Sequence, residues 1–154
     1  MVDDAPRQGF PRCEIQTPAD RWRTATALIE AMNKAKILIV DDDAKISSLL
    51  GLILRRNGYD VREENRSFAA LATARDFRPQ LALLDVDMPG KDGGSVAAEL
   101  AADREFAHMP VVFVTSLVRP NEAGMHGSAR FLSKPVDVSI LLATVREILP
   151  SLAA

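Results

Sequence analysis

Five polar side chains stand at the ends of four short runs of this sequence, three of which are apolar. They are Asp41, Asp42, Asp85, Thr115 and Lys134. If the runs are strands of one parallel sheet, their carboxyl ends meet at the edge where open α/β sheets bind ligands. Three carboxylates, a hydroxyl and an ammonium group would then share one small site.

This combination of groups suits phosphoryl chemistry. Three carboxylates within ~4 Å of one another repel by a few kcal/mol per pair even at an effective dielectric of ~20, so the cluster needs a cation. Carboxylate oxygens with room for water suit Mg²⁺ better than Zn²⁺, which prefers His and Cys. Lys134 adds a second positive charge and the Thr115 hydroxyl adds a hydrogen bond. The pattern therefore predicts a nucleophilic carboxylate at Asp85 and an acyl phosphate as its product.

The elements that must position these residues follow from the hydrophobic pattern. Residues 81–84 are all apolar, which predicts a strand buried on both faces, because a half-buried strand alternates with polar residues. Predicted strands cover residues 36–40, 59–63, 81–84, 111–114 and 130–133, and predicted helices cover roughly 18–33, 43–56, 67–76, 95–104 and 137–149. This alternation predicts an α/β fold of three layers, a doubly wound parallel five-stranded sheet with helices on both faces.

Several polar residues mark the expected ends of helices. Asp43 and Asp137 stand where helix N-caps are expected, and Ser67 is the predicted cap of the helix at 67–76. Asp92 is interpreted as a turn former.

The segment 117–129 departs from the regular alternation of strands and helices. It contains Pro120, Gly124 and Gly127, and these residue types disfavour a helix interior. Any helix there has at most a turn or two, so we expect the fourth helix of the domain to be shortened.

The N-terminal part of the chain is predicted to be an extension of the domain. The predicted divisions are an extension at 1–35, the domain at 36–150 and a tail at 151–154. Within the extension, residues 18–33 carry Trp22 and Ile29 at helical spacing, which is typical of an amphipathic helix. This helix is either a dimerisation or docking helix, or part of a partly ordered extension or translated leader ahead of a start at Met32.

Composition limits the classes of function. The 154 residues are 47% hydrophobic with a formal charge of −2, which is enough for one well-cored domain. The 19 basic residues are outnumbered by 21 acidic ones, which disfavours a nucleic-acid-binding surface. Cys13 is the single cysteine, which fits a reducing compartment. The apolar runs are too short to span a membrane, and the acidic start does not resemble a secretory signal. We expect a soluble, cytoplasmic protein that contacts neither nucleic acid nor membrane.

The chain from about 36 to 150 resembles a response-regulator receiver domain of bacterial two-component signalling, in stand-alone form. The motifs that carry the resemblance are Val40-Asp41-Asp42, Asp85 followed by Met88-Pro89 and Asp92-Gly93, Thr115-Ser116, and Lys134-Pro135. The resemblance implies the flavodoxin-like strand order 2-1-3-4-5. It also implies a phosphorelay module that is no enzyme beyond promoting its own phosphorylation and dephosphorylation.

The resemblance assigns roles to the acidic residues. Asp85 is implied to be the phosphoacceptor, which takes phosphate from a histidine kinase or a histidine phosphotransfer protein. Mg²⁺ is the implied cofactor. Asp42 and Asp85 would bind it directly, Asp41 mostly through water, and Asp87 with its backbone carbonyl.

The resemblance also implies how the signal is read. Thr115 and Lys134 would contact the phosphoryl group, and Phe131 fills the aromatic switch position whose ring moves inward when Thr115 does. The face near Phe131 and the last helix is the implied contact for a downstream protein partner. His108 and His126 are isolated in the sequence and are interpreted as loop histidines.

Three alternative functions stay open. The sequence 85–87 resembles the nucleophile and acid of a haloacid-dehalogenase-like aspartyl-phosphate hydrolase, but Pro89 falls where that motif has Thr or Val. A nucleotide- or flavin-binding module of the same architecture needs glycines where this chain has acidic residues after the first strand. A phosphorylation-independent adaptor differs from the preferred interpretation only in whether Asp85 is used.

Overall fold

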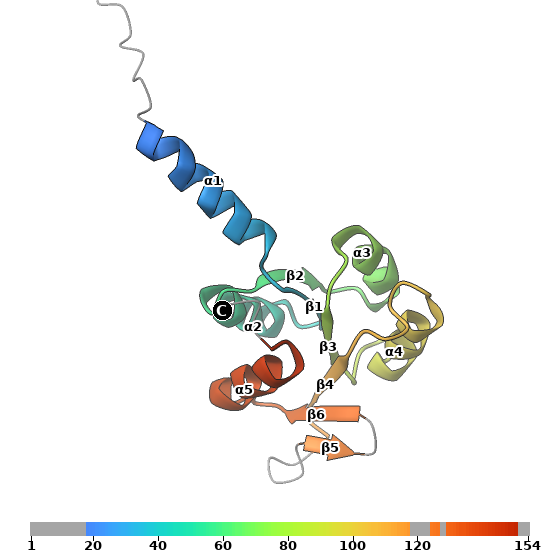
Figure 1. The fold of residues 1–154 in the computed structure, drawn as a ribbon. Helices are drawn as coiled ribbons and strands as arrows, with labels where there is room; N and C mark the ends of the chain where they lie inside the picture. Colours follow the sequence, from blue (N-terminus) through green and yellow to red (C-terminus); the bar gives the residue numbers. More distant parts are fainter. Residues whose placement is uncertain (1–17, 118–123, 127–128, 151–154) are drawn as a thin grey trace, which may run out of the picture. The chain divides into compact units, whose positions relative to one another are not determined.

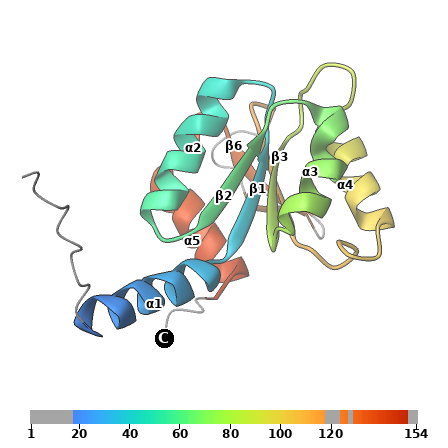
Figure 2. The same ribbon diagram turned by 90° about the horizontal axis from the view of Figure 1, so that it is seen from above.

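The computed structural model describes residues 18–117, 124–126 and 129–150. The chain divides into two compact units, Met1–Met32 and Asn33–Ala154. In the larger unit a central sheet has helices on both faces (Figures 1 and 2). This is the three-layer α/β architecture that the sequence predicts.

The sheet has six strands in the order β2-β1-β3-β4-β6-β5. The strands are β1 (Lys36–Val40), β2 (Asp60–Glu64), β3 (Leu81–Asp85), β4 (Val111–Thr115), β5 (Gly124–His126) and β6 (Ala129–Ser133). Strands β1, β2, β3, β4 and β6 pair in parallel and form a continuous sheet. If β6 is counted as the fifth parallel strand, the predicted order 2-1-3-4-5 is confirmed.

Helices cover both faces of the sheet. They are α2 (Ala44–Arg56), α3 (Ala70–Phe77), which follows the short 3₁₀ helix η1 (Ser67–Ala69), α4 (Gly93–Ala102) and α5 (Val138–Ile148). Figure 2 shows α2 and α5 on one face and α3 and α4 on the other. Side chains of α2 and α5 contribute to one buried cluster, and side chains of α3 and α4 to a second.

Strand β1 shows why the central strands consist of consecutive apolar residues. Ile37 and Ile39 belong to the cluster under α2 and α5, whereas Leu38 and Val40 belong to the cluster under α3 and α4. Successive side chains of a strand point to opposite faces, so a strand covered on both sides needs apolar residues at every position. The strand ends are therefore fixed from both sides.

Two predicted helix caps are confirmed. The Asp43 carboxylate accepts from the amide of Lys45 at 2.9 Å, at the start of α2. The Asp137 carboxylate accepts from the amides of Ser139 and Ile140 at 2.8 and 3.1 Å, at the start of α5. These bonds satisfy amide groups that have no partner within the helix.

One predicted helix cap is wrong, and one cap was not predicted. Ser67 does not cap α3: it is buried in η1, and α3 begins at Ala70 behind Ala69, which makes no side-chain cap bond. Asp92 is more than a turn former, because its carboxylate accepts from the Ser95 amide at 2.7 Å and caps α4. A cap and a turn favour the same residue types, so local composition did not separate them.

Within the segment 117–129, the structure contains a strand that was not expected. Residues 118–123 and 127–128 lie outside the described residues, so the predicted shortened helix falls largely there. The described residues 124–126 form β5, which pairs antiparallel with β6. The sequence analysis did not predict this strand.

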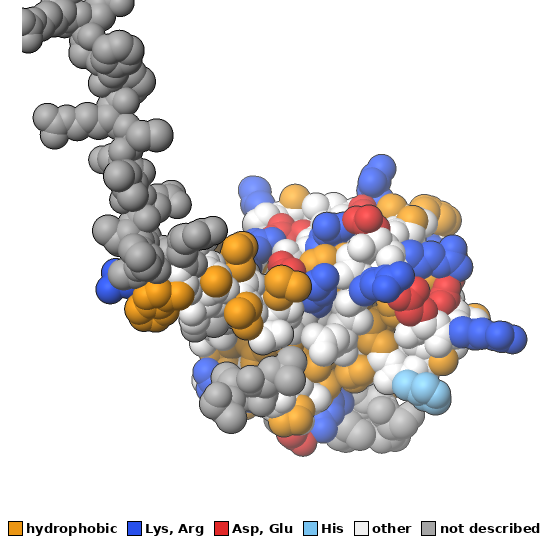
Figure 3. Space-filling model, turned by 45° about the horizontal axis from the view of Figure 1, so that its top comes forward, with side chains coloured by type: hydrophobic (Ala, Val, Ile, Leu, Met, Phe, Trp, Pro, Cys, Tyr) orange, Lys and Arg blue, Asp and Glu red, His pale blue; other side chains and the backbone are white. Residues whose placement is uncertain are grey.

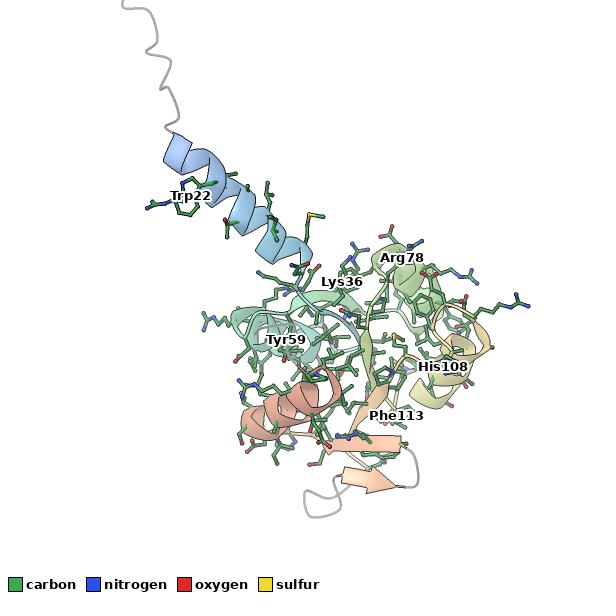
Figure 4. All side chains as sticks on the ribbon, viewed as in Figure 1. Trp22, Lys36, Tyr59, Arg78, His108 and Phe113 are labelled. Carbon is green, nitrogen blue, oxygen red and sulfur yellow. The ribbon has the colours of Figure 1, made fainter. Side chains whose placement is uncertain are left out.

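The N-terminal unit is described by one helix, α1 (Pro18–Met32), which confirms the predicted helix at 18–33. Trp22, Leu28, Ile29 and Met32 are exposed on it. Orange side chains lie along this helix in Figure 3, and Trp22 is labelled in Figure 4. Across the described residues, we find no helix with the length and apolar character that crossing a bilayer requires.

Two leucines of α2 provide a matched test of the core. Leu54 is 0% exposed and Leu49 is 58% exposed. We expect Leu54→Ala to lower the free energy of unfolding by about 2–5 kcal/mol, because it leaves a cavity, and Leu49→Ala to change it by less than about 1 kcal/mol. Urea unfolding measures both, and equal losses would contradict the assignment of the buried face.

Candidate functional site

The register of the sheet brings the polar strand ends to one edge. Val40 pairs with Leu84, so Asp41 and Asp85 follow at neighbouring positions of β1 and β3. Thr115 pairs with Ser133, which places Lys134 just beyond β6. The residues that were predicted to share a site therefore leave the sheet at the same edge.

Lys134 joins two of the carboxylates. Its Nζ donates to Asp41 Oδ2 at 2.7 Å and lies 3.3 Å from Asp85 Oδ1. Asp41 is 2% exposed and Asp85 is 5% exposed, so both charges are largely removed from water. The second oxygen of Asp41, Oδ1, accepts from the Asp43 amide at 2.9 Å. Buried charges persist when they are paired and hydrogen-bonded in this way.

The surroundings shift the pKa of the buried Asp85 and of the half-buried Lys134. Burial and the nearby charge of Asp41 raise the pKa of Asp85, and the charge of Lys134 only partly offsets them. Burial alone lowers the pKa of Lys134, but the hydrogen bond and charge of Asp41, together with Asp85, outweigh it and raise that pKa. Lys134 is therefore a stable cation at neutral pH.

The three acids can hold a metal ion. Asp41, Asp42 and Asp85 each present a carboxylate oxygen, and these three oxygens lie within 4.8 Å of one another. Lys134 balances one negative charge of the ionised cluster, which leaves an excess that a divalent cation would neutralise. Asp42 is exposed, so water can complete the coordination of such an ion. Oxygen donors of this kind fit a hard cation.

The other predicted site residues lie around this cluster. The Asp87 amide donates to Asp85 Oδ1 at 3.3 Å, and its side chain is exposed. Thr115 is buried, and its hydroxyl accepts from the Leu117 amide at 3.1 Å. Its carbonyl accepts from the Lys134 amide at 2.9 Å, which links the ends of β4 and β6.

Phe131 lies on β6 and stacks on Phe113 of β4. The ring centroids are 5.2 Å apart and the planes differ by 24°. Phe113 is labelled in Figure 4, and it packs against the apolar cluster beneath α3 and α4. His108 is exposed between α4 and β4, as expected for a loop histidine, whereas the loop assignment of His126 is wrong, because this residue lies in β5.

Gly93 supports the site through a backbone contact that was not predicted from the sequence. Its amide donates to the carbonyl of Val86 at 3.1 Å. A Cβ at this position would lie 2.2 Å from the carbonyl oxygen of Asp85. The first turn of α4 thus packs directly on the backbone of Asp85. Asp92-Gly93 is one of the motifs that carry the family resemblance, but the sequence did not predict the contact that requires a glycine at position 93.

The family model for the response regulator receiver domain matches residues 37–146. The chain belongs to this family. It is 32% identical to the protein PilH of Pseudomonas aeruginosa over 118 residues, a match that covers 75% of this chain and 98% of PilH. The crystal structure of the chemotaxis protein CheY4 of Vibrio cholerae is 27% identical, with a TM-score of 0.67 over 75% of this chain and 98% of CheY4.

Other members of the family are longer. The DNA-binding dual master transcriptional regulator RpaA of Synechocystis is 37% identical over 117 residues, which are 74% of this chain and 48% of RpaA. This chain therefore spans about half the length of RpaA and nearly all of PilH. The shared region is the receiver domain.

Gly93 and Gly94 form a matched pair for testing the contact between α4 and Asp85. Gly93→Ala places a methyl group against backbone, and we expect it to lower the free energy of unfolding by about 1–3 kcal/mol. Gly94→Ala meets only the Asp92 carboxylate at 3.3 Å, and we expect a change within about 1 kcal/mol. Urea unfolding compares them, and a Gly93→Ala protein as stable as the Gly94→Ala protein would contradict the close approach.

Proposed function

We propose that this chain is the phosphoacceptor of a two-component phosphorelay. Asp85 takes a phosphoryl group from a histidine kinase or a histidine phosphotransfer protein in a reaction that depends on Mg²⁺. The observation that carries the proposal is the Lys134 ammonium group, which contacts both Asp41 and Asp85 beside a third carboxylate. Membership of the receiver family supports the same conclusion.

The proposed step is a displacement at phosphorus. A carboxylate oxygen of Asp85 forms the new bond to phosphorus while the bond from phosphorus to the donor histidine nitrogen breaks. The donor imidazole leaves with the bonding electrons and takes up a proton from water. Lys134 offers its ammonium group to the charge that remains on the phosphoryl oxygens, and the Thr115 hydroxyl offers a hydrogen bond.

Mg²⁺, when bound, supplies positive charge to the phosphoryl oxygens in the transition state. Asp42 and Asp85 would bind it directly, Asp41 mostly through water, and Asp87 with its backbone carbonyl. The proximity of the three carboxylate oxygens supports a metal site formed by Asp41, Asp42 and Asp85.

Phosphorylation is proposed to shift an existing equilibrium between conformations rather than create a new fold. Thr115 and Phe131 would form the switch, and the surface near Phe131 and α5 would contact a downstream protein partner. Phe131 is half-buried and stacks on Phe113, which supports a switch in which its ring moves further into the protein.

The wider assignment follows from the same proposal. Residues 36–150 would form the receiver module, 1–35 an extension whose helix could join two copies of the chain, and 151–154 a tail. The protein would work in the cytoplasm, with proteins rather than nucleic acid or membranes as partners. Its chemistry would be limited to its own phosphorylation and dephosphorylation.

Asp85 and Asp87 provide a direct test of the phosphoacceptor. We expect the wild-type chain to gain the mass of one phosphoryl group when incubated with acetyl phosphate and Mg²⁺, as read by intact mass spectrometry. Asp85→Ala should abolish the gain because it removes the nucleophile, and Asp87→Ala should retain it. Uptake by Asp85→Ala equal to the wild type would refute Asp85 as the acceptor.

The uptake assay and a phosphatase assay with a generic phosphomonoester separate two of the alternatives. A folded wild-type chain that gains no phosphoryl group would favour a phosphorylation-independent adaptor. Steady release of phosphate from a generic phosphomonoester would favour a hydrolase of the haloacid-dehalogenase kind.

Asp42 and Asp43 are adjacent acids that test the metal site. We expect Asp42→Asn to weaken Mg²⁺ binding by about 10-fold or more, because it removes a direct ligand. Asp43→Asn keeps a good helix cap and should have a much smaller effect. Isothermal titration calorimetry with Mg²⁺ measures both constants. Equal weakening would indicate that only overall charge matters.

A further inference from the structure

Asn65 follows β2, and its side chain contacts the loop that carries the acidic pair. Its Nδ2 donates to the carbonyl oxygen of Asp41 at 2.7 Å and to the Ser47 hydroxyl at 2.8 Å. The Ser47 hydroxyl in turn donates to the Ala44 carbonyl at 3.2 Å. One amide group thus ties both ends of the turn between β1 and α2.

The residue before Asn65 adds a second link. The Asp41 amide donates to the carbonyl of Glu64 at 3.2 Å. Both peptide groups of Asp41 are therefore held from the end of β2, one by the Glu64 backbone and one by the Asn65 side chain.

The end of β2 is itself well anchored. The buried Glu64 carboxylate accepts from the Thr73 hydroxyl at 2.7 Å and from the Arg66 amide at 3.0 Å. Burial of Glu64 raises its pKa, but these hydrogen bonds and the Arg66 charge outweigh burial, so its pKa is lowered overall. An ionised, hydrogen-bonded Glu64 keeps the following residue, Asn65, in place.

The direction of the Asp41 carboxylate depends on these backbone bonds. Its two oxygens are used by the Asp43 amide and by Lys134. If the Asp41 peptide groups could rotate, its carboxylate would lose the hydrogen bonds to the Asp43 amide and to Lys134. Its oxygen would then no longer be held close to the carboxylate oxygens of Asp42 and Asp85. A primary amide suits this bridge, because it provides two N–H groups for two acceptors.

We infer that Asn65 is a positioning residue for the metal site: it holds the turn 41–44 in the conformation in which the three carboxylates converge. The inference rests on the proposed Mg²⁺-dependent function and extends it to a residue outside the predicted strand-end motifs. Residues that orient metal ligands affect metal affinity without touching the ion.

The test is Mg²⁺ binding by full-length Asn65→Ala, measured by isothermal titration calorimetry. We expect the dissociation constant to rise about 3- to 10-fold. Hydrogen exchange of the Asp42 and Asp43 amides in the metal-free protein should become faster. Ser47→Ala, which removes one of the two acceptors, should weaken binding by a smaller factor and serves if Asn65→Ala folds poorly.

Asn57→Ala is the matched control. The Asn57 side chain also donates to a backbone carbonyl, that of Ile53 at 2.9 Å, but at the far end of α2. We expect this variant to lose stability as Asn65→Ala does and to keep the wild-type affinity for Mg²⁺. Unfolding in urea, with a chelator present, measures the stability of each variant.

The outcomes separate the inference from the function on which it rests. A wild-type chain that does not bind Mg²⁺ would overturn both. A wild-type chain that binds Mg²⁺, with unchanged affinity and unchanged amide exchange in Asn65→Ala and Ser47→Ala, would overturn the positioning role alone.

Discussion

The ion pairs of the half-buried Lys134 ammonium group with Asp41 and Asp85 are the interaction on which the site depends. The two carboxylates are largely removed from water and close enough to repel each other, so each needs a nearby positive charge. Lys134 follows β6, and the acids stand at the ends of β1 and β3. The three meet only if the strands adopt the observed order and register, which means that the sheet and the site are specified together.

The rest of the fold makes these strand ends rigid. Helices on both faces bury every side chain of β3, from Leu81 to Asp85. Aspartate caps at Asp43, Asp92 and Asp137 begin the helices that follow three of the strands. Each connection therefore starts its helix at a defined residue. A charged site at the edge of a sheet benefits from such stiffness, because its groups need little rearrangement to meet a ligand.

The sequence predicted the parts of the fold that depend on local pattern. Apolar runs identified the central strands β1, β3 and β4, and the polar residues at the predicted strand ends identified the groups that the sheet brings together. Contacts between distant segments were not predictable in this way: Asn65 reaches Asp41 from another strand, and Gly93 packs on the Asp85 backbone. The caps show a second limit. Aspartate suits both turns and helix starts, so Asp92 was assigned only to a turn, whereas η1 displaced Ser67 from the position that composition favoured.

Strand β5 forms one of the two outer edges of the sheet. It pairs antiparallel with β6 and occupies the side of that strand opposite β4. The other outermost strand, β2, carries the charged residues Arg62 and Glu63. Charged side chains on an outer strand oppose the docking of a foreign strand, and a short added strand shields backbone groups that could otherwise template it. Both borders of the sheet thus resist the intermolecular strand addition that leads to aggregation.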